Sequence, residues 1–368
     1  MKRQNKTMVL LAICMAGMYG CSNDHEEDAA GNKQVELAVN PSIIQTRAEG
    51  SEGVHPGTDG SVLGSIAVYA NSVVTNATAN NFAVYTYNNG TSKWENSAGS
   101  DKIYLSNEAA IIYANYPSTK TASHLSTAVN ADSEVEISTL AGTAGSADNN
   151  NTITITGGST SAINACTGEV DYMYAIPVKN MNNTSAGANL TMNHAMSMVS
   201  FRIYKDHSYI NNGRLTKIEL SNATGDNVLL KPGASGKATM KLGDGTVVIS
   251  SGEAVTYTRF TKENANDYYE LKNASNDETT PTVPAFSILV YPVNTKIDAG
   301  KVQVKFEIDS KVYSLNLPEK AVDNGYSWAP GKNYVYIVNM NGKGLNVTTV
   351  ELTAWTDITV GDKTDLVN

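Results

Sequence analysis

Short segments in which apolar and polar residues alternate are the feature that most constrains the fold of this 368-residue chain. In residues 302–308, four apolar side chains are separated by Gln303, Lys305 and Glu307. Because successive side chains of a β-strand point to opposite faces, a period of two predicts strands with one buried face. Similar segments occur at residues 66–69, 82–87, 109–113, 152–156 and 199–203. Long amphipathic helical patterns are missing from the sequence, so we expect an all-β fold of the sandwich type.

Asn-Gly and Asp-Gly pairs lie between these segments and predict tight turns. Asparagine, aspartate and glycine tolerate the positive φ angles that hairpin turns require. The pairs are Asp59-Gly60, Asn89-Gly90, Asn212-Gly213, Asp244-Gly245, Asn324-Gly325 and Asn341-Gly342.

The length of the chain exceeds that of a usual single core, so we predict two domains. A polar stretch at residues 180–189 places their boundary near residue 188 and gives domains 48–188 and 189–344.

The first twenty residues have the features of an export signal. Three basic residues precede an apolar run at residues 8–18, which is too short to span a bilayer as a helix. The run leads into Met18-Tyr19-Gly20-Cys21, where a small residue precedes a cysteine. We therefore predict a signal peptide at residues 1–20 and acylation of Cys21. An ordinary signal peptide with an unmodified cysteine is the alternative.

Residues 21–47 combine a short strand with a candidate cleavage site. Val35, Leu37 and Val39 share one face of a period-two segment. Arg47-Ala48 follows at the start of a glycine-rich stretch, and the chain contains only five arginines. An Arg-specific protease would therefore meet few other targets, and a cut here would remove the strand. The alternative is an unprocessed arginine in a surface loop.

A second notable strand is predicted at the C-terminal end. Its apolar residues share one parity, and polar residues occupy the other. The apolar residues are Val350, Leu352, Ala354, Ile358 and Val360. This alternation predicts a long strand with one apolar face. Such a strand either completes its own sheet or is donated to another molecule, and the pattern alone leaves both arrangements open.

Charge and cysteine content exclude several classes of protein. The net charge is −9 and no basic block is present, which argues against a nucleic acid partner. Of the three cysteines, Cys14 lies in the signal and Cys21 is the proposed lipid site. Cys166 is then alone, which excludes a disulfide framework and favours a small buried residue.

No catalytic or metal-binding constellation stands out in the sequence. The five histidines form no ligand pair at helical spacing, and neither a phosphate-binding loop nor a Gly-x-Ser-x-Gly elbow is present. Glu169 and Asp171 flank Val170, and we interpret them as solvated surface carboxylates. His194 lies beside an alternating segment, which predicts a hydrogen-bonded, partly buried histidine. We expect no enzyme, no cofactor and no metal site.

Tryptophan could indicate a carbohydrate-binding surface, but the pattern here does not support one. The three tryptophans are too widely separated in the sequence to indicate a sugar-binding platform. They are Trp94, Trp328 and Trp355.

Several short motifs together resemble the fimbrillins of Bacteroides-type bacteria, which are the pilins of the type V pilus. They are the Cys21 and Arg47 segments, residues 171–175, 194–201 and 328–336, and the tail around Trp355. The resemblance spans nearly the whole chain. It implies two tandem transthyretin-like β-sandwich domains and delivery to the outer membrane as a lipoprotein.

The resemblance also implies assembly by donor-strand exchange. An Arg-specific, trypsin-like protease would cut at Arg47-Ala48, and the emptied groove would accept the C-terminal arm, residues 345–368, of a neighbouring subunit. The partners would be other copies of the chain together with anchor and tip pilins. Because a C-terminal arm is typical of shaft subunits, we expect a shaft pilin in a surface pilus, or fimbrium, that supports cell adhesion through a receptor the sequence does not identify.

Three other functions stay open at this stage. A lipid-anchored, surface glycan-binding protein would keep residues 22–47. An anchor or tip pilin would share the fold but retain its lipid or carry an adhesive site. A surface hydrolase has the least support, because the sequence contains no catalytic constellation.

Overall fold

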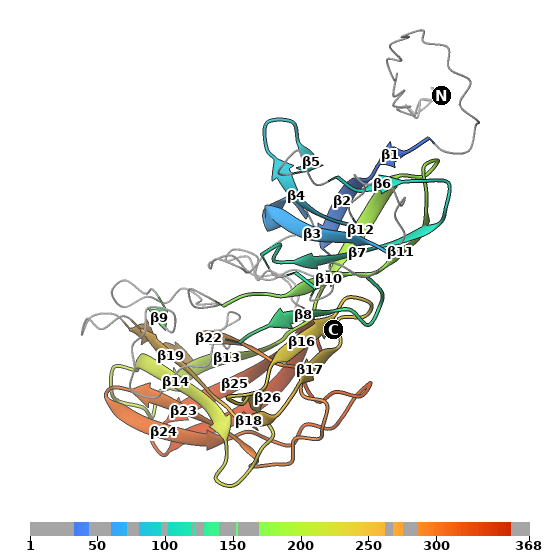
Figure 1. Cartoon of the computed structure of the whole chain (residues 1–368). Helices are drawn as coiled ribbons and strands as arrows, with labels where there is room; N and C mark the ends of the chain where they lie inside the picture. The colour runs from blue at the N-terminus through green and yellow to red at the C-terminus, as the bar shows by residue number, and fades with distance from the viewer. Residues whose placement is uncertain are drawn as a thin grey trace, which may run out of the picture. The chain divides into compact units, whose positions relative to one another are not determined.

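The computed structural model describes residues 33–43, 60–71, 81–96, 102–119, 121–122, 129–139, 152–153, 169–261, 268–274 and 286–354. In these residues the regular secondary structure consists of β-strands and one short 3₁₀ helix, η1 (Gly60–Leu63), without an α-helix (Figure 1). The expected all-β class is therefore confirmed. Within the same residues, no helix is long and apolar enough to cross a membrane. The described residues all belong to one compact unit.

The largest sheet has eight strands and comes mainly from the first half of the chain. Its order is β2-β12-β10-β7-β3-β4-β5, with β11 paired to β7. The bounds are β2 (Ala38–Ile43), β3 (Ser65–Ala70), β4 (Phe82–Asn88), β5 (Lys93–Asn96), β7 (Ala110–Tyr116), β10 (Met173–Ala175), β11 (Val178–Met181) and β12 (Gly187–His194). Next to it, β1 (Val35–Glu36) pairs with β6 (Tyr104–Leu105). The predicted strands at residues 66–69, 82–87 and 109–113 are thus observed in this part of the fold.

Two further large sheets come mainly from the second half of the chain. One contains β13 (Ser197–Asp206), β21 (Lys272–Ala274), β22 (Phe286–Val290), β25 (Lys332–Asn341) and β26 (Gly344–Ala354). The other contains β9 (Thr152–Ile153), β14 (Arg214–Asn222), β19 (Thr256–Thr261), β20 (Tyr269–Glu270), β23 (Val302–Ile308) and β24 (Lys311–Asn316). Both sheets contribute to one buried core, in which Phe201 of β13 and Phe306 of β23 lie 5.5 Å apart between ring centroids.

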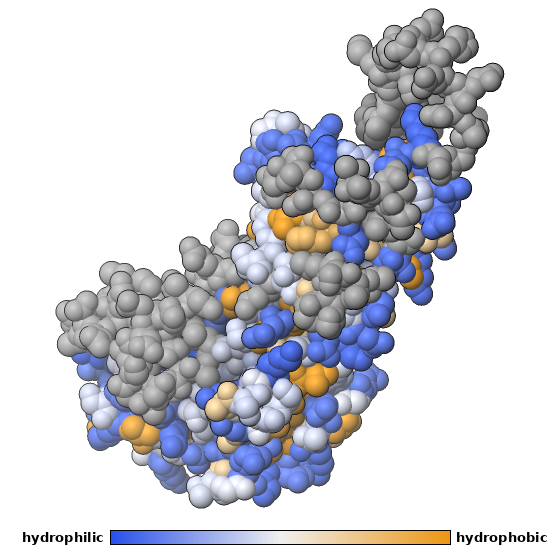
Figure 2. All heavy atoms as spheres, in the orientation of Figure 1, coloured by the Kyte–Doolittle hydropathy of each residue, from blue (hydrophilic) through white to orange (hydrophobic). Residues whose placement is uncertain are grey.

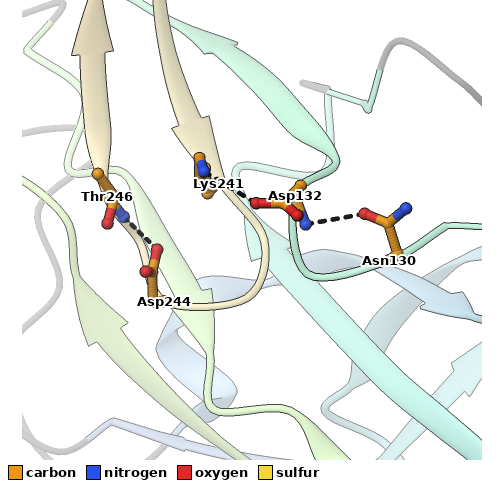
Figure 3. Close-up of polar contacts among 5 residues, drawn as sticks. All are labelled: Asn130, Asp132, Lys241, Asp244 and Thr246. Atoms are coloured by element: carbon orange, nitrogen blue, oxygen red, sulfur yellow. Dashed lines mark hydrogen bonds and ion pairs between the residues drawn. The ribbon is translucent and has the colours of Figure 1, made fainter.

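A three-stranded sheet joins the two halves of the sequence. In it β16 (Ala238–Lys241) pairs with both β8 (Glu134–Ile137) and β17 (Val247–Ile249). Lys241 Nζ lies 2.8 Å from Asp132 Oδ1, and the Asp132 N–H donates to Asn130 Oδ1 at 2.8 Å (Figure 3). In the turn after β16, the Thr246 N–H donates to Asp244 Oδ1 at 2.9 Å. These contacts fasten the loop before β8 to a hairpin more than a hundred residues later. A two-stranded sheet, β15 (Leu230–Pro232) with β18 (Gly252–Ala254), completes the described strands.

The predicted domain boundary at residue 188 falls inside β12. The polar stretch that suggested it forms the turn between β11 and β12, where Asn182 and Ser185 make an isolated bridge. The change of sheet comes later, between His194 at the end of β12 and Ser197 at the start of β13. The division into domains 48–188 and 189–344 stays a prediction.

Two of the predicted tight turns are observed with the expected chemistry. Asn324 and Gly325 have φ angles of 50° and 86°, and the flanking Asp323 and Tyr326 exchange backbone hydrogen bonds of 2.8 and 2.9 Å. Positive φ at both central residues is typical of a hairpin turn. Asn341-Gly342 begins the turn between β25 and β26, where Asn341 Oδ1 accepts hydrogen bonds from the N–H groups of Lys343 and Gly344.

Candidate strand-exchange site

The strand predicted from Val35, Leu37 and Val39 occupies the edge of the eight-stranded sheet. β2 pairs in parallel with β12, with Ala38 opposite Gly187 and Ile43 opposite Met192. This is the one parallel pair among the described ladders of that sheet. On its other side, β2 pairs with no described strand. β2 is therefore the last strand of the sheet, and its departure would break its ladder with β12 but no pairing between the inner strands.

Side chains of β2 alternate strictly between the core and the surface. Val39 and Ile43, and Leu37 directly before the strand, are 8%, 2% and 1% exposed and belong to the core of the eight-stranded sheet. Pro41 is buried with them, whereas the intervening side chains are exposed. Val35 is only half-buried, beside its partner Leu105. The alternation thus continues through Pro41 and Ile43, two inward residues beyond the three that were predicted.

Backbone geometry explains why a proline is tolerated in β2. The Ala38 N–H donates to the Ala186 carbonyl at 2.8 Å, so N–H groups of this parity point toward β12. Pro41 has the opposite parity, and its missing N–H would have pointed away from β12, so no ladder hydrogen bond is lost. Gly60 of η1 closes over this point. A Cβ added at Gly60 would lie 2.1 Å from the Pro41 carbonyl oxygen, so only glycine allows this approach.

Polar contacts fix the start of the strand. The Leu37 N–H donates to the Ile103 carbonyl at 2.8 Å, and the Tyr85 hydroxyl donates to the Leu37 carbonyl at 2.7 Å. Burial raises the pKa of Tyr85, so the phenol stays protonated and can donate. Lys102 Nζ lies 2.7 Å from Glu36 Oε2, and this hydrogen bond to the carboxylate raises the pKa of Lys102. The pair orients residues 35–37 along the sheet.

Side-chain burial provides most of the hold on β2. At about 1.5–3 kcal/mol for each large aliphatic side chain, Leu37, Val39 and Ile43 contribute roughly 5–9 kcal/mol as an upper bound. A typical domain is stable by only about 5–15 kcal/mol. Removing β2 would therefore leave an apolar slot beside the unpaired edge of β12, a surface that attracts another strand.

The described part of the predicted C-terminal strand forms β26, the edge strand next to β25. Val350 lies opposite Tyr336, Leu352 opposite Tyr334, and Ala354 opposite Lys332. A register shift after Val347 places these residues on the same face of the strand as Leu345 and Val347. Leu345 and Val347 pack against the core that contains Phe201 and Phe306. Val350 is 36% exposed. In the single chain, this segment completes its own sheet, one of the two arrangements left open by the sequence.

Several predicted site residues lie outside the described part of the chain. They are Cys21, Arg47, Ala48, Cys166, Ile358 and Val360. Their predicted roles stay predictions. Ile43 is the last described residue before Arg47, which places the predicted cleavage site four residues after the end of β2.

Glu169 and Asp171 are buried, so the prediction of solvated surface carboxylates was wrong. Asp171 Oδ2 lies 2.8 Å from His194 Nδ1, and Glu169 Oε1 contacts the Arg259 guanidinium at 2.5 Å. Buried carboxylates require such partners, and both partners come from distant parts of the sequence. His194 is hydrogen-bonded as predicted, but it is fully rather than partly buried. The two carboxylates thus have separate partners, Arg259 for Glu169 and His194 for Asp171.

Tryptophans in the described residues do not form a carbohydrate platform. Trp328 is fully buried, and its Nε1–H lies 3.3 Å from the Tyr336 hydroxyl. Trp94 is half-buried against the core of the eight-stranded sheet. On the face drawn in Figure 2, the coloured hydrophobic residues reach the surface as small patches among hydrophilic ones. The part of the chain that the structure describes also contains no group of three or more His, Cys, Asp or Glu residues able to hold a metal ion.

The family model described as Fimbrillin-like matches residues 46–355 of the sequence. The chain belongs to the Fimbrillin-like family. No curated protein matches this fimbrillin-like protein. Its membership places it with structural pilus and cell adhesion proteins rather than with enzymes. The matched segment begins one residue before Arg47 and leaves out β1 and β2.

Solved structures give an independent comparison for the fold. A candidate cell adhesion protein from Bacteroides uniformis is 12% identical to the fimbrillin-like chain, with a TM-score of 0.51 over 87% of this chain and 98% of that one. A candidate cell adhesion protein from Bacteroides ovatus is 15% identical, with a TM-score of 0.50 over 88% and 98% of the two chains. At these identities the similarity shows a shared fold.

Proposed function

We propose that this fimbrillin-like protein is a shaft pilin of a type V-like pilus, polymerises by protease-triggered donor-strand exchange and supports cell adhesion. The position of β2 gives the main support for this proposal. β2 is an edge strand that seals a core with three aliphatic side chains, and it is followed four residues later by Arg47-Ala48. A strand placed in this way can be made replaceable by one cut in the chain.

Cleavage after Arg47 would change the binding of β2 without changing its contacts. In the precursor, β2 is tethered to its slot, so its local concentration is high, of the order of millimolar. After the cut, the strand is a separate peptide that dilutes away once it dissociates. Cys21 lies upstream of the cut, so the same reaction would free the subunit from a lipid anchor in the outer membrane. Processing would thus release the subunit and open the slot together.

The proposed donor is the C-terminal arm, residues 345–368, with Val350, Leu352, Ala354, Ile358 and Val360 as the inserting residues. An edge position supports this role, because β26 can leave β25 without splitting the inner strands of its sheet. Insertion of the tail of one subunit into the slot of the next is a head-to-tail contact that does not close on itself, and such contacts produce filaments.

The proposed pilin has two domains. We assign two tandem transthyretin-like sandwiches to residues 48–188 and 189–344, supported by the separate cores around β2 and around β13. The arm favours a shaft position over a tip or anchor position. The partners would be other pilin subunits, including anchor and tip pilins, and an Arg-specific, trypsin-like protease. The assembled protein would lie on the cell surface, in the fimbrium.

Treatment of the purified full-length chain with an Arg-specific protease tests the proposal. We expect the native sequence to acquire an Ala48 N-terminus and to form fibres visible by electron microscopy. Arg47→Gln is the matched control and should stay monomeric under the same conditions. A surface protein that retains residues 22–47, or an Arg47→Gln variant that polymerises as well as the native chain, would contradict the proposal and favour a lipid-anchored binding protein.

A further inference from the structure

The two edge strands of the proposed exchange share a sequence pattern. Residues 35–43 read Val-Glu-Leu-Ala-Val-Asn-Pro-Ser-Ile, and residues 350–358 read Val-Glu-Leu-Thr-Ala-Trp-Thr-Asp-Ile. Four of the nine positions are identical when the two segments are aligned without a gap, namely the first three and the last. Both segments run in the same direction in this alignment.

Three of the four identities fall on the inward face that closes the slot. Leu37 and Ile43, which are 1% and 2% exposed, correspond to Leu352 and Ile358. Val35 corresponds to Val350. At the two remaining inward positions, Val39 is matched by the smaller Ala354, and Pro41 by Thr356, which is close to proline in size. The second segment therefore fills the slot without overpacking it, and overpacking is what a dense core tolerates poorly.

Charge complementarity supports the same alignment. Glu36 pairs with Lys102 across 2.7 Å, and Glu351 occupies the equivalent position in the second segment. Within its own sheet, Glu351 accepts a hydrogen bond from Arg202 at 2.8 Å. The carboxylate would therefore exchange one basic partner for another when the strand moves. Reversal of the strand would place Glu351 at the other end of the slot, where Ser42 lies in the precursor.

We propose that residues 350–358 of one subunit replace residues 35–43 of the next in the same direction and register. Thr353 to Ile358 then pair in parallel with Gly187 to Met192, as Ala38 to Ile43 do in the precursor. This inference rests on the proposed strand exchange, and it adds the direction and the register. It places Trp355 beside Asn189, Asp357 beside Thr191, and Glu351 beside Lys102.

Disulfide trapping between outward-facing positions tests the register. Asn189 is exposed and accepts a hydrogen bond from Asn40 at 3.3 Å, so neighbouring side chains at this point can meet. Full-length chains carrying Cys166→Ser and Asn189→Cys are combined with either Trp355→Cys or Asp357→Cys. A parallel set uses Thr191→Cys with the same two tail substitutions. The uncut Asn40→Cys, Asn189→Cys precursor is the positive control and should form its disulfide within one chain.

Fibres are formed with the Arg-specific protease, oxidised, and separated on non-reducing gels. We expect ladders of linked subunits for the 189 with 355 and 191 with 357 combinations, several times stronger than for the crossed combinations. Stronger ladders for the crossed combinations, 189 with 357 or 191 with 355, would show a different direction or register of the donor and overturn the proposal. Fibres without a ladder in any combination would also overturn it.

A peptide assay keeps the register testable if a cysteine variant does not polymerise. Synthetic peptides spanning residues 349–360, with Trp355→Cys or Asp357→Cys, are added to the processed Asn189→Cys chain. Preferential linkage of the first peptide supports the register, and equal or reversed preference contradicts it. Failure of the native processed chain to form fibres would count against the proposed function, whereas fibres with the wrong linkage pattern would count only against the register.

Discussion

β2 and β26 are both edge strands, yet they are held in different ways. β2 runs parallel to its neighbour, and its Val39 and Ile43, together with Leu37 directly before it, insert into a core. β26 runs antiparallel to β25 along a long ladder, and Val350 in the middle of it is 36% exposed. Parallel pairing is slightly weaker per residue, so side-chain burial dominates for β2 and backbone pairing for β26. We infer that a replaceable strand is one that closes a core. A donor strand is one that can leave its sheet without opening its own core.

Removal of residues 345–368 should have the largest effect on assembly and a small effect on folding. The chain should still fold and be secreted, because β26 only borders the second core, but it should form no fibres. Circular dichroism and electron microscopy after protease treatment measure the two properties. Removal of residues 361–368 alone is the matched control and should leave polymerisation unchanged. Normal fibres from the longer deletion would eliminate the C-terminal arm as the donor.

Leu37→Ala should be the most destabilising single substitution in residues 35–43. It removes a fully buried side chain, so we expect the free energy of unfolding of the uncut precursor to fall by about 2–5 kcal/mol. Denaturant titration measures the change. An effect within about 0.5 kcal/mol, the usual range for exposed sites, would mean that β2 does not seal the core.

Gly60→Ala should weaken the seating of β2 by a smaller amount. The added Cβ would lie 2.1 Å from the Pro41 carbonyl oxygen, so η1 or β2 must shift, at a cost of about 1–3 kcal/mol. Gly187→Ala in β12 is the matched control, since a Cβ there meets no atom within 4 Å. Equal stability of the two variants would contradict the close contact between η1 and β2.

Val350→Ala should cost the uncut precursor less than Leu37→Ala, because the Val350 side chain is already partly in water. We expect a loss of about 1 kcal/mol or less in the free energy of unfolding, since the full burial value applies only to enclosed side chains. The same denaturant titration gives the comparison. A loss as large as that of Leu37→Ala would show that β26 is as deeply held as β2 and is a poor candidate for release.

Lys102→Gln should have the smallest effect. The Lys102–Glu36 pair is largely exposed, so its loss should be barely visible in unfolding. The pair should instead influence how fast the strand dissociates after processing, and added salt should reduce the difference from the native chain. Fluorescence of a labelled residue 33–47 peptide, released from the cut protein at low and high salt, measures this. A difference that persists at high salt would exclude the ion pair as its origin.

Local alternation predicted much of this fold and part of the site. The inward faces of β2 and β23 follow directly from their sequences, as does the turn at Asn341-Gly342. The end of β2, which contains Pro41, was not predicted. A strand tolerates a proline only where the missing N–H would point away from the neighbouring strand. Such a direction is a property of the pairing and is not encoded in the local pattern.

Long-range contacts account for what the sequence could not give. Burial of Glu169 and Asp171 depends on Arg259 and His194, which approach only in the folded chain. The pairing of β8 with β16 likewise joins segments about a hundred residues apart. Strand faces and turns depend on neighbouring residues and are predicted well, whereas buried charges and pairings between distant segments depend on tertiary structure.

The most direct test of strand exchange is mass spectrometry of subunits from purified fibres, reading both termini. If strands are exchanged, the subunits begin at Ala48, retain residues 345–360 and contain no bound peptide from residues 33–43. Fibres whose subunits still carry residues 33–43, whether covalently attached or seated in the slot, would contradict strand exchange.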